Sequence, residues 1–317
     1  MDELAVELRG LTKSYVRFPL TRVPVVRGLN LDVPAGGVHA LLGPNGSGKT
    51  TTLRMLLGLV RPESGTVRVL GHAVPGALPA VVGRIGAVVE QPRLFPAFSG
   101  RRNLELLARA ADVPAARVDE VLDEVGLRDR ARDPVRRYSL GMKQRAAIAA
   151  TLLRRPDLVV LDEPTNGLDP QGVHDVRALM RRLADQGRTV LVSSHALGDL
   201  EQVADTVSVL AAGRLVAQGR LDDLLASRGA PRLRVRVADP ERAALALAGH
   251  GWSAHVDGGA VVVTDPPPAA DVSRVLAGVG LYPEELTVLR PDLESAYLAL
   301  TAGSGPAAVR DPAEVGS

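Results

Sequence analysis

Hydrophobic and polar residues follow two regular patterns along this chain, and each pattern predicts a type of element. Alternation predicts half-buried strands at 4–8 and 29–33, joined by a polar connection that contains Pro19 and Pro24. Unbroken apolar runs predict strands that are buried on both faces. These runs lie at 38–42, 158–161 and 189–192, and further strand candidates lie at 66–70 and 85–89.

Leucine and valine residues recur at helical spacing in other segments. One such helix follows Lys49, and two more lie between residues 100 and 137. Ser139 is placed to cap a further helix that has an apolar face. We therefore expect a helical insertion over about 100–150, inside a unit whose strands alternate with helices. That alternation is typical of a largely parallel, doubly wound α/β sheet.

The pattern changes late in the chain. Residues 227–231 have the composition of a linker, and the strand that follows alternates arginine with leucine and valine. The elements expected after the linker have the order β-α-β-β-α-β, which fits a small ferredoxin-like domain of α+β class. The expected organisation is a first domain at 1–226, an accessory domain at 232–301 with a helix at 293–300, and a disordered tail at 302–317.

Composition and charge narrow the possible classes of function. Hydrophobic residues make up 46% and charged residues 23% of the 317 residues, as in globular proteins. A net charge of +2 gives no support for a nucleic-acid binder. The chain has no cysteine, which excludes disulfides and thiolate metal sites. An acidic N-terminus and the lack of a long apolar run predict a cytoplasmic protein without a signal peptide or membrane span. Lysine occurs only at Lys13, Lys49 and Lys143.

A phosphate-binding loop is the strongest chemical signal in the sequence. The run after the strand at 38–42 matches the pattern G-x-x-x-x-G-K-[ST] at every required position, and a helix follows it. Glycines allow backbone N–H groups to surround a phosphate, and the lysine adds a full positive charge. The threonine hydroxyl is a hard oxygen ligand for Mg²⁺. The expected binding residues are Gly43, Pro44, Asn45, Gly46, Ser47, Gly48, Lys49, Thr50 and Thr51.

Two carboxylates follow the apolar run at 158–161. Asp162 is placed at the carboxyl end of a buried strand, where ligands of parallel sheets bind, and is expected to join the Mg²⁺ shell. Glu163 lies one residue further, where it could orient and deprotonate an attacking water. An acidic strand end is weak evidence for a nucleotide site by itself, but it is strong evidence when the same chain contains a phosphate loop.

Several further motifs resemble those of ATP-binding-cassette (ABC) ATPases. The run 138–145, Tyr-Ser-Leu-Gly-Met-Lys-Gln-Arg, resembles the family signature, and Leu168-Asp169 resembles the D-loop. Ser194-His195 resembles the switch histidine, and Tyr15 lies where the family stacks an aromatic ring on adenine. The resemblance covers roughly residues 4–225. It implies an ATPase fold with a mostly parallel sheet, an antiparallel N-terminal β part and a helical insertion.

The resemblance also implies a mechanism in which two such domains pair head to tail around ATP. Ser139 and Gly141 of one subunit would contact the γ-phosphate held by the loop of the other. Glu163 would be the general base, His195 would hold the γ-phosphate and the water, and Asp169 would connect the two sites. The pair could be a homodimer or a heterodimer.

The sequence departs from the common family pattern at several positions. Leu140 replaces a glycine of the signature, a variant that resembles the branch serving antibiotic and peptide exporters with separate permeases. The glutamine expected to touch Mg²⁺ and the permease falls on Glu90, with Gln91 one residue later, and either could serve. For Tyr15, a tyrosine packed in the core is the alternative to one that stacks on adenine.

The resulting hypothesis is an ATP-hydrolysing subunit, with ATP and Mg²⁺ as cofactors, that energises a membrane exporter of drug, peptide or lipid-like cargo. It would attach to the inner face of the membrane through a permease on a separate chain. Leu94, Phe95 and Phe98 either form part of the docking surface or pack locally in the core. The rival hypothesis is an ABC-type ATPase that acts on nucleic acid or ribosomes, and a small-molecule kinase or GTPase would leave the signature unexplained.

Overall fold

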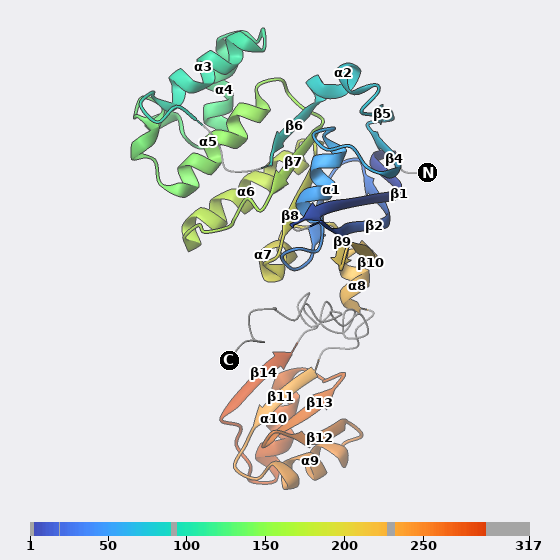
Figure 1. Cartoon of the computed structure of the whole chain (residues 1–317). Helices are drawn as coiled ribbons and strands as arrows, with labels where there is room; N and C mark the ends of the chain where they lie inside the picture. The colour runs from blue at the N-terminus through green and yellow to red at the C-terminus, as the bar shows by residue number, and fades with distance from the viewer. Residues whose placement is uncertain (1–2, 19, 90–93, 227–231, 290–317) are drawn as a thin grey trace, which may run out of the picture. The chain divides into compact units, whose positions relative to one another are not determined.

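The computed structural model describes residues 3–18, 20–89, 94–226 and 232–289 (Figure 1). These residues form two compact units that divide between Leu221 and Asp222. The first unit contains two sheets and most of the helices, and the second contains one small sheet, the two helices that pack on it and most of the helix at Leu221–Ala226.

An antiparallel sheet opens the first unit, and its strand order is β2-β1-β4-β5. The expected polar connection between two short strands is wrong, because β1 and β2 form one long hairpin. Pro24 pairs with Ser14 inside this hairpin, next to an irregularity in the register. The proline is tolerated because β2 is an edge strand. One side of an edge strand has no neighbouring strand, so an N–H on that side is not needed for pairing. The strands are β1 (Leu4–Arg17), β2 (Thr21–Pro34), β4 (Ser64–Val69) and β5 (His72–Val74).

The second sheet confirms the predicted doubly wound, largely parallel architecture. Its order is β10-β9-β3-β8-β7-β6, and every neighbouring pair is parallel except β10 with β9. The three apolar runs form its central strands, each buried on both faces as expected. The strands are β3 (Val38–Leu42), β6 (Ile85–Val88), β7 (Leu158–Asp162), β8 (Thr189–Ser194), β9 (Thr206–Ala211) and β10 (Arg214–Arg220).

One buried polar residue ties two of these strands together. The His39 ring on β3 lies 2.7 Å from the Thr206 hydroxyl and 2.9 Å from the Ser208 hydroxyl, both on β9. Burial away from water disfavours the charged imidazolium and lowers the pKa of His39 to about 4. The strand that leads into the phosphate loop therefore contains a neutral, hydrogen-bonded histidine.

Helix α1 packs between the two sheets, where its leucines join the main hydrophobic core. The helical insertion lies where the sequence predicts it and consists of α3, α4 and α5, with α5 also packing on β6 and α6. The helices of this part of the chain are α1 (Lys49–Leu56), α2 (Leu78–Val81), α3 (Gly100–Ala110), α4 (Ala116–Glu124), α5 (Leu140–Leu152), α6 (Pro170–Asp185), α7 (Leu197–Glu201) and α8 (Leu221–Ala226).

The second unit is an antiparallel sheet of order β12-β13-β11-β14, with helices on one face. Its element order is β-α-β-β-α-β. The elements are β11 (Arg232–Arg236), α9 (Pro240–Ala248), β12 (Ser253–Asp257), β13 (Ala260–Thr264), α10 (Ala269–Gly278) and β14 (Glu285–Leu289). The expected helix at 293–300 and the tail at 302–317 lie outside the described residues, and the role of this unit as an accessory domain stays a prediction.

Candidate functional site

The predicted phosphate loop connects β3 to α1, and its glycines are required by close backbone approaches. A Cβ atom on Gly43 would lie 2.4 Å from the Leu210 carbonyl oxygen. Gly48 has φ 103°, and a Cβ atom there would lie 2.8 Å from the Val25 carbonyl oxygen. The loop is therefore pressed against β9 on one side and the hairpin strand β2 on the other. Only glycine fits both positions.

Lys49 is the first residue of α1, and its side chain is 5% exposed. Its amine donates to the carbonyl oxygens of Gly43, at 2.7 Å, and Pro44, at 3.3 Å. The same amine lies 3.2 Å from the Glu163 carboxylate. A buried ammonium at a helix N-terminus is an attractive site for an anion, because the helix dipole and the full charge act in the same direction.

The Glu163 carboxylate joins Lys49 to His195. One oxygen, Oε1, faces Lys49, and the other, Oε2, lies 2.7 Å from His195 Nδ1 and accepts from the His195 backbone N–H at 3.3 Å. The Glu163 backbone has φ 48°, a left-handed conformation that a side chain disfavours. A strained backbone conformation of this kind persists only where neighbouring groups hold it in place. Here Ser193 does so, because its carbonyl and hydroxyl oxygens both accept from the Glu163 N–H.

Asp162 lies at the carboxyl end of β7, as the sequence predicts, and pairs with Ser193 on β8. The Ser193 hydroxyl donates to Asp162 Oδ1 in a short hydrogen bond. Ser193 thus orients the Asp162 carboxylate and fixes the backbone of Glu163, although nothing in the sequence motifs singles it out. Ser47 was expected only as a loop residue, yet its hydroxyl oxygen is buried and has no hydrogen-bond partner among the described residues.

The signature residues begin α5. The prediction that Ser139 caps a helix is confirmed, because its hydroxyl accepts from the Met142 N–H at 3.2 Å. A Cβ atom on Gly141 would lie 3.3 Å from the Gly172 Cα atom, so this glycine allows α5 to approach the start of α6 closely. Leu140, which replaces the usual glycine, is 48% exposed.

In the described part of the chain, neither Asp169 nor Tyr15 forms a hydrogen bond or ion pair with the cluster of Lys49, Glu163 and His195. The Asp169 carboxylate caps α6 by accepting from the Gly172 N–H at 2.9 Å. Tyr15 is 39% exposed on β1, so the alternative of a core tyrosine does not hold.

Two predicted site residues, Glu90 and Gln91, belong to residues 90–93, which the structure does not describe, so the choice between them is untested. Phe95 is 62% and Phe98 42% exposed, and their ring centroids are 5.4 Å apart. Local core packing therefore does not explain these two phenylalanines.

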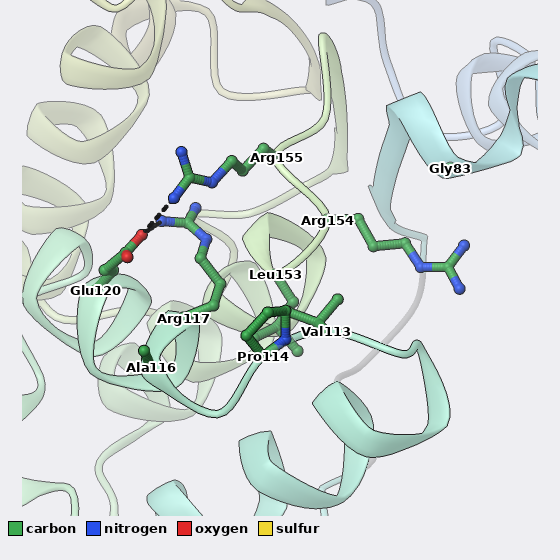
Figure 2. Close-up of a pocket in the computed structure, with 9 residues that line it drawn as sticks. All are labelled: Gly83, Val113, Pro114, Ala116, Arg117, Glu120, Leu153, Arg154 and Arg155. Carbon is green, nitrogen blue, oxygen red and sulfur yellow. Dashed lines mark hydrogen bonds and ion pairs between the residues drawn. The ribbon is translucent and has the colours of Figure 1, made fainter.

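Two of the cavities beside the helical insertion differ in whether predicted site residues line them. One of about 580 Å³ brings two carboxylates together with the first turn of α5, and its lining includes Leu94, Leu140, Lys143, Asp162 and Glu163. The other, of about 450 Å³, contains no predicted site residue (Figure 2). Its polar side is an ion-pair cluster that connects α4 with the segment after α5, because Glu120 accepts from both Arg117 on α4 and Arg155.

The comparisons with known proteins agree with this geometry. Residues 26–166 match the family model described as ABC transporter. The daunorubicin resistance ATP-binding protein DrrA3 of Streptomyces coeruleorubidus is 41% identical over 95% of this chain and 97% of its own length. The bacitracin transport ATP-binding protein BcrA of Enterococcus faecalis is 34% identical over 96% of this chain and 98% of its own.

Solved structures give the same result. The dimeric, post-hydrolysis state of the ATP-binding cassette MJ0796, bound to ADP and phosphate, has a TM-score of 0.61 and 26% identity, covering 68% of this chain and 98% of that one. CbiO1 from Clostridium perfringens, part of the ABC transporter complex cbiONQ, has a TM-score of 0.64 and 28% identity, covering 72% and 92%. This chain therefore belongs to the ABC transporter family, as an ATP-binding and ATP-hydrolysing subunit.

Proposed function

We propose that the cluster of Lys49, Glu163 and His195 is the site at which this subunit hydrolyses ATP. The observation that supports this most strongly is the position of Glu163, whose two carboxylate oxygens lie against Lys49 and His195 beside the phosphate loop. A phosphate-binding cation, a carboxylate base and a histidine are thereby brought to one place from three separate segments of the chain.

In this proposal the loop binds the β- and γ-phosphates through its backbone N–H groups, and Thr51 contributes at the start of α1. Lys49 neutralises phosphate charge, and a phosphate competes with Glu163 for the lysine amine. Release from Lys49 leaves the Glu163 carboxylate able to accept a proton from the attacking water. His195, within 2.7 Å of that carboxylate, orients the water and the γ-phosphate.

The residues present also fit Mg²⁺. Thr50 and Asp162 would hold the ion, because a hydroxyl and a carboxylate are the hard oxygen donors it prefers. Among the described residues no group of three or more His, Asp or Glu side chains could hold a metal by itself. Mg²⁺ at nucleotide sites typically takes one or two protein ligands beside phosphate and water. When bound, the ion would supply neutralising charge to the phosphates.

Base recognition is assigned to Tyr15. The hairpin that contains it contacts the phosphate loop at Gly48, where the Val25 carbonyl lies too close to admit a side chain. Tyr15 lies further toward the tip of the hairpin, paired with Val23. An exposed aromatic ring on the hairpin that contacts the phosphate loop is suited to stacking on adenine.

Two copies are proposed to close head to tail around ATP. The dimeric structure of MJ0796, to which this chain is similar, supports this proposal. Ser139 and Gly141 lie at the N-terminus of α5, where the helix dipole favours a phosphate presented by the partner. Asp169 caps α6 in each copy and lies at the exposed start of that helix, from which it can connect the two sites.

The transporter would be an exporter, because relatives of this chain include proteins named for daunorubicin resistance and bacitracin transport. A drug, peptide or lipid-like cargo would be selected by a permease on another chain. Phe95 and Phe98 form the exposed apolar surface proposed to contact that permease. No helix among the described residues has the length and apolar character needed to cross a membrane. Through its contact with the permease, the subunit is proposed to lie on the inner face of the membrane.

Phosphate release from MgATP tests this proposal. Lys49→Ala removes the buried ammonium, so turnover and ATP affinity should both fall sharply while the fold is retained. Arg68→Met provides a control, because Arg68 is an exposed cation on β4 that donates to the Gly71 carbonyl oxygen. Near-normal hydrolysis by Lys49→Ala would disprove the assignment of the phosphate loop.

A further inference from the structure

Lys13 connects the hairpin to the segment that follows the phosphate-loop helix. Its amine donates to the Arg61 carbonyl oxygen at 3.0 Å and lies 5.6 Å from the centroid of the Tyr15 ring. Arg61 comes after α1, the helix that begins at Lys49. One ammonium group thus contacts both the aromatic ring and the backbone that extends from the phosphate site.

Glu63 anchors the same part of the hairpin from both of its strands. Its carboxylate accepts from the Ser14 N–H at 3.1 Å and the Ser14 hydroxyl at 3.2 Å, on β1, and pairs with Arg22 at 2.9 Å, on β2. The Arg22 guanidinium holds the pKa of Glu63 below its ordinary value. The Glu63 N–H also donates to the Thr12 carbonyl oxygen. The hairpin is therefore fixed on each side of Lys13.

The register of the hairpin relates these anchors to the phosphates. Lys13 pairs with Val26, and Val26 is one of the residues that a side chain on Gly48 would meet. Tyr15 pairs with Val23 further along the hairpin. The register is irregular between Lys13 and Ser14, and the ammonium of Lys13 nevertheless lies over the Tyr15 ring. The ammonium can steady the ring while 39% of the tyrosine remains exposed.

We propose that Lys13 is a positioning residue that holds the Tyr15 ring in the orientation required to stack on the base of the nucleotide. This inference rests on the proposed function of Tyr15. A cation beside an aromatic ring is attracted to it, and the hydrogen bond to Arg61 fixes where that cation lies. Lys13 would act on nucleotide affinity through Tyr15 and would not contact the reacting phosphates.

The test is binding of mant-ATP to the full chain, with steady-state ATP hydrolysis as a second measurement. Lys13→Met removes the charge and the donor but keeps the length of the side chain. It should weaken binding and raise KM by about 2- to 5-fold, as for loss of an exposed cation–aromatic contact, with kcat unchanged. Lys13→Arg keeps a cation and should restore most of the affinity. Arg68→Met, on the neighbouring strand, should change neither quantity.

A double-variant cycle separates this inference from the proposed function. Tyr15→Ala should weaken binding by about 5- to 150-fold, the range for loss of a base–aromatic stack. In that background Lys13→Met should have no further effect. An equal effect of Lys13→Met with and without Tyr15, or no effect in the parent chain, would overturn the role of Lys13. Parent affinity in Tyr15→Ala, together with loss of binding in Lys49→Ala, would instead refute the assignment of Tyr15 while leaving the ATPase site in place.

Discussion

Glu163→Gln is the most informative change at the proposed site, because it keeps the size of the side chain and removes its charge. The parent carboxylate lies 3.2 Å from the Lys49 amine and 2.7 Å from His195 Nδ1. Glutamine can still accept a hydrogen bond from either group, so the local geometry should persist. It cannot accept a proton from water, so general-base catalysis should be lost.

The expected loss of rate follows from that single function. General-base catalysis typically contributes about 10²- to 10⁴-fold, which corresponds to roughly 3–5 kcal/mol of barrier. ATP affinity should be retained or raised, because Lys49 no longer pairs with a competing carboxylate. Since ATP would bridge Lys49 of one subunit and Ser139 of the other, stalled hydrolysis should stabilise the closed dimer.

Phosphate release measures the rate, and size-exclusion chromatography with ATP measures the dimer. Ser139→Arg, added to Glu163→Gln, should return the dimer to monomer by blocking the interface. Glu7→Gln is the matched control, because Glu7 on β1 forms a surface ion pair with Arg9 and is not part of the proposed site. Hydrolysis by Glu163→Gln at the parent rate would refute the general-base role. Failure to dimerise with ATP, both alone and with the permease, would refute the head-to-tail mechanism.

Two further predictions concern the fold. A chain that ends at Ser227 should remain soluble and bind ATP, because every motif of the site precedes that residue. Circular dichroism measures its folding, and a chain that fails to fold would show that the domain boundary is wrong. The low pKa of His39, about 4 against an ordinary 6.5, means that folding favours the neutral ring. The resulting stability is present above pH 6.5 and is lost as the pH falls towards 4, by up to about 3 kcal/mol. Urea unfolding at pH 7 and pH 5 should show a smaller decrease in His39→Gln than in the parent chain, and equal decreases would argue against this origin.

The parts of the molecule that the sequence predicts well depend on local patterns. The loop from Gly43 to Thr50 requires glycines, a lysine and a flanking strand and helix, all within a few residues. The buried strands are mainly apolar runs, which need no tertiary information to recognise. Ser139 illustrates the same point, because its capping bond reaches only to Met142.

The features that sequence reasoning missed depend on contacts between distant segments. Pro24 suggests a break, yet it lies within a strand because β2 is at the edge of its sheet. Ser193 orients Asp162 and fixes the left-handed backbone of Glu163, although it is separated from both by about thirty residues and belongs to no motif. Such partners become visible only when neighbouring strands are aligned.

The central claim is that Glu163 and His195 act together at one hydrolytic site. The most direct test is the single-turnover rate of ATP hydrolysis by Glu163→Gln, His195→Ala and the double variant. When two catalytic groups act as a unit, the losses of rate caused by removing each of them are strongly non-additive. We therefore expect the double variant to be about as slow as the slower single variant. Losses that multiply would mean that the two side chains act independently, and the account of the site would be contradicted.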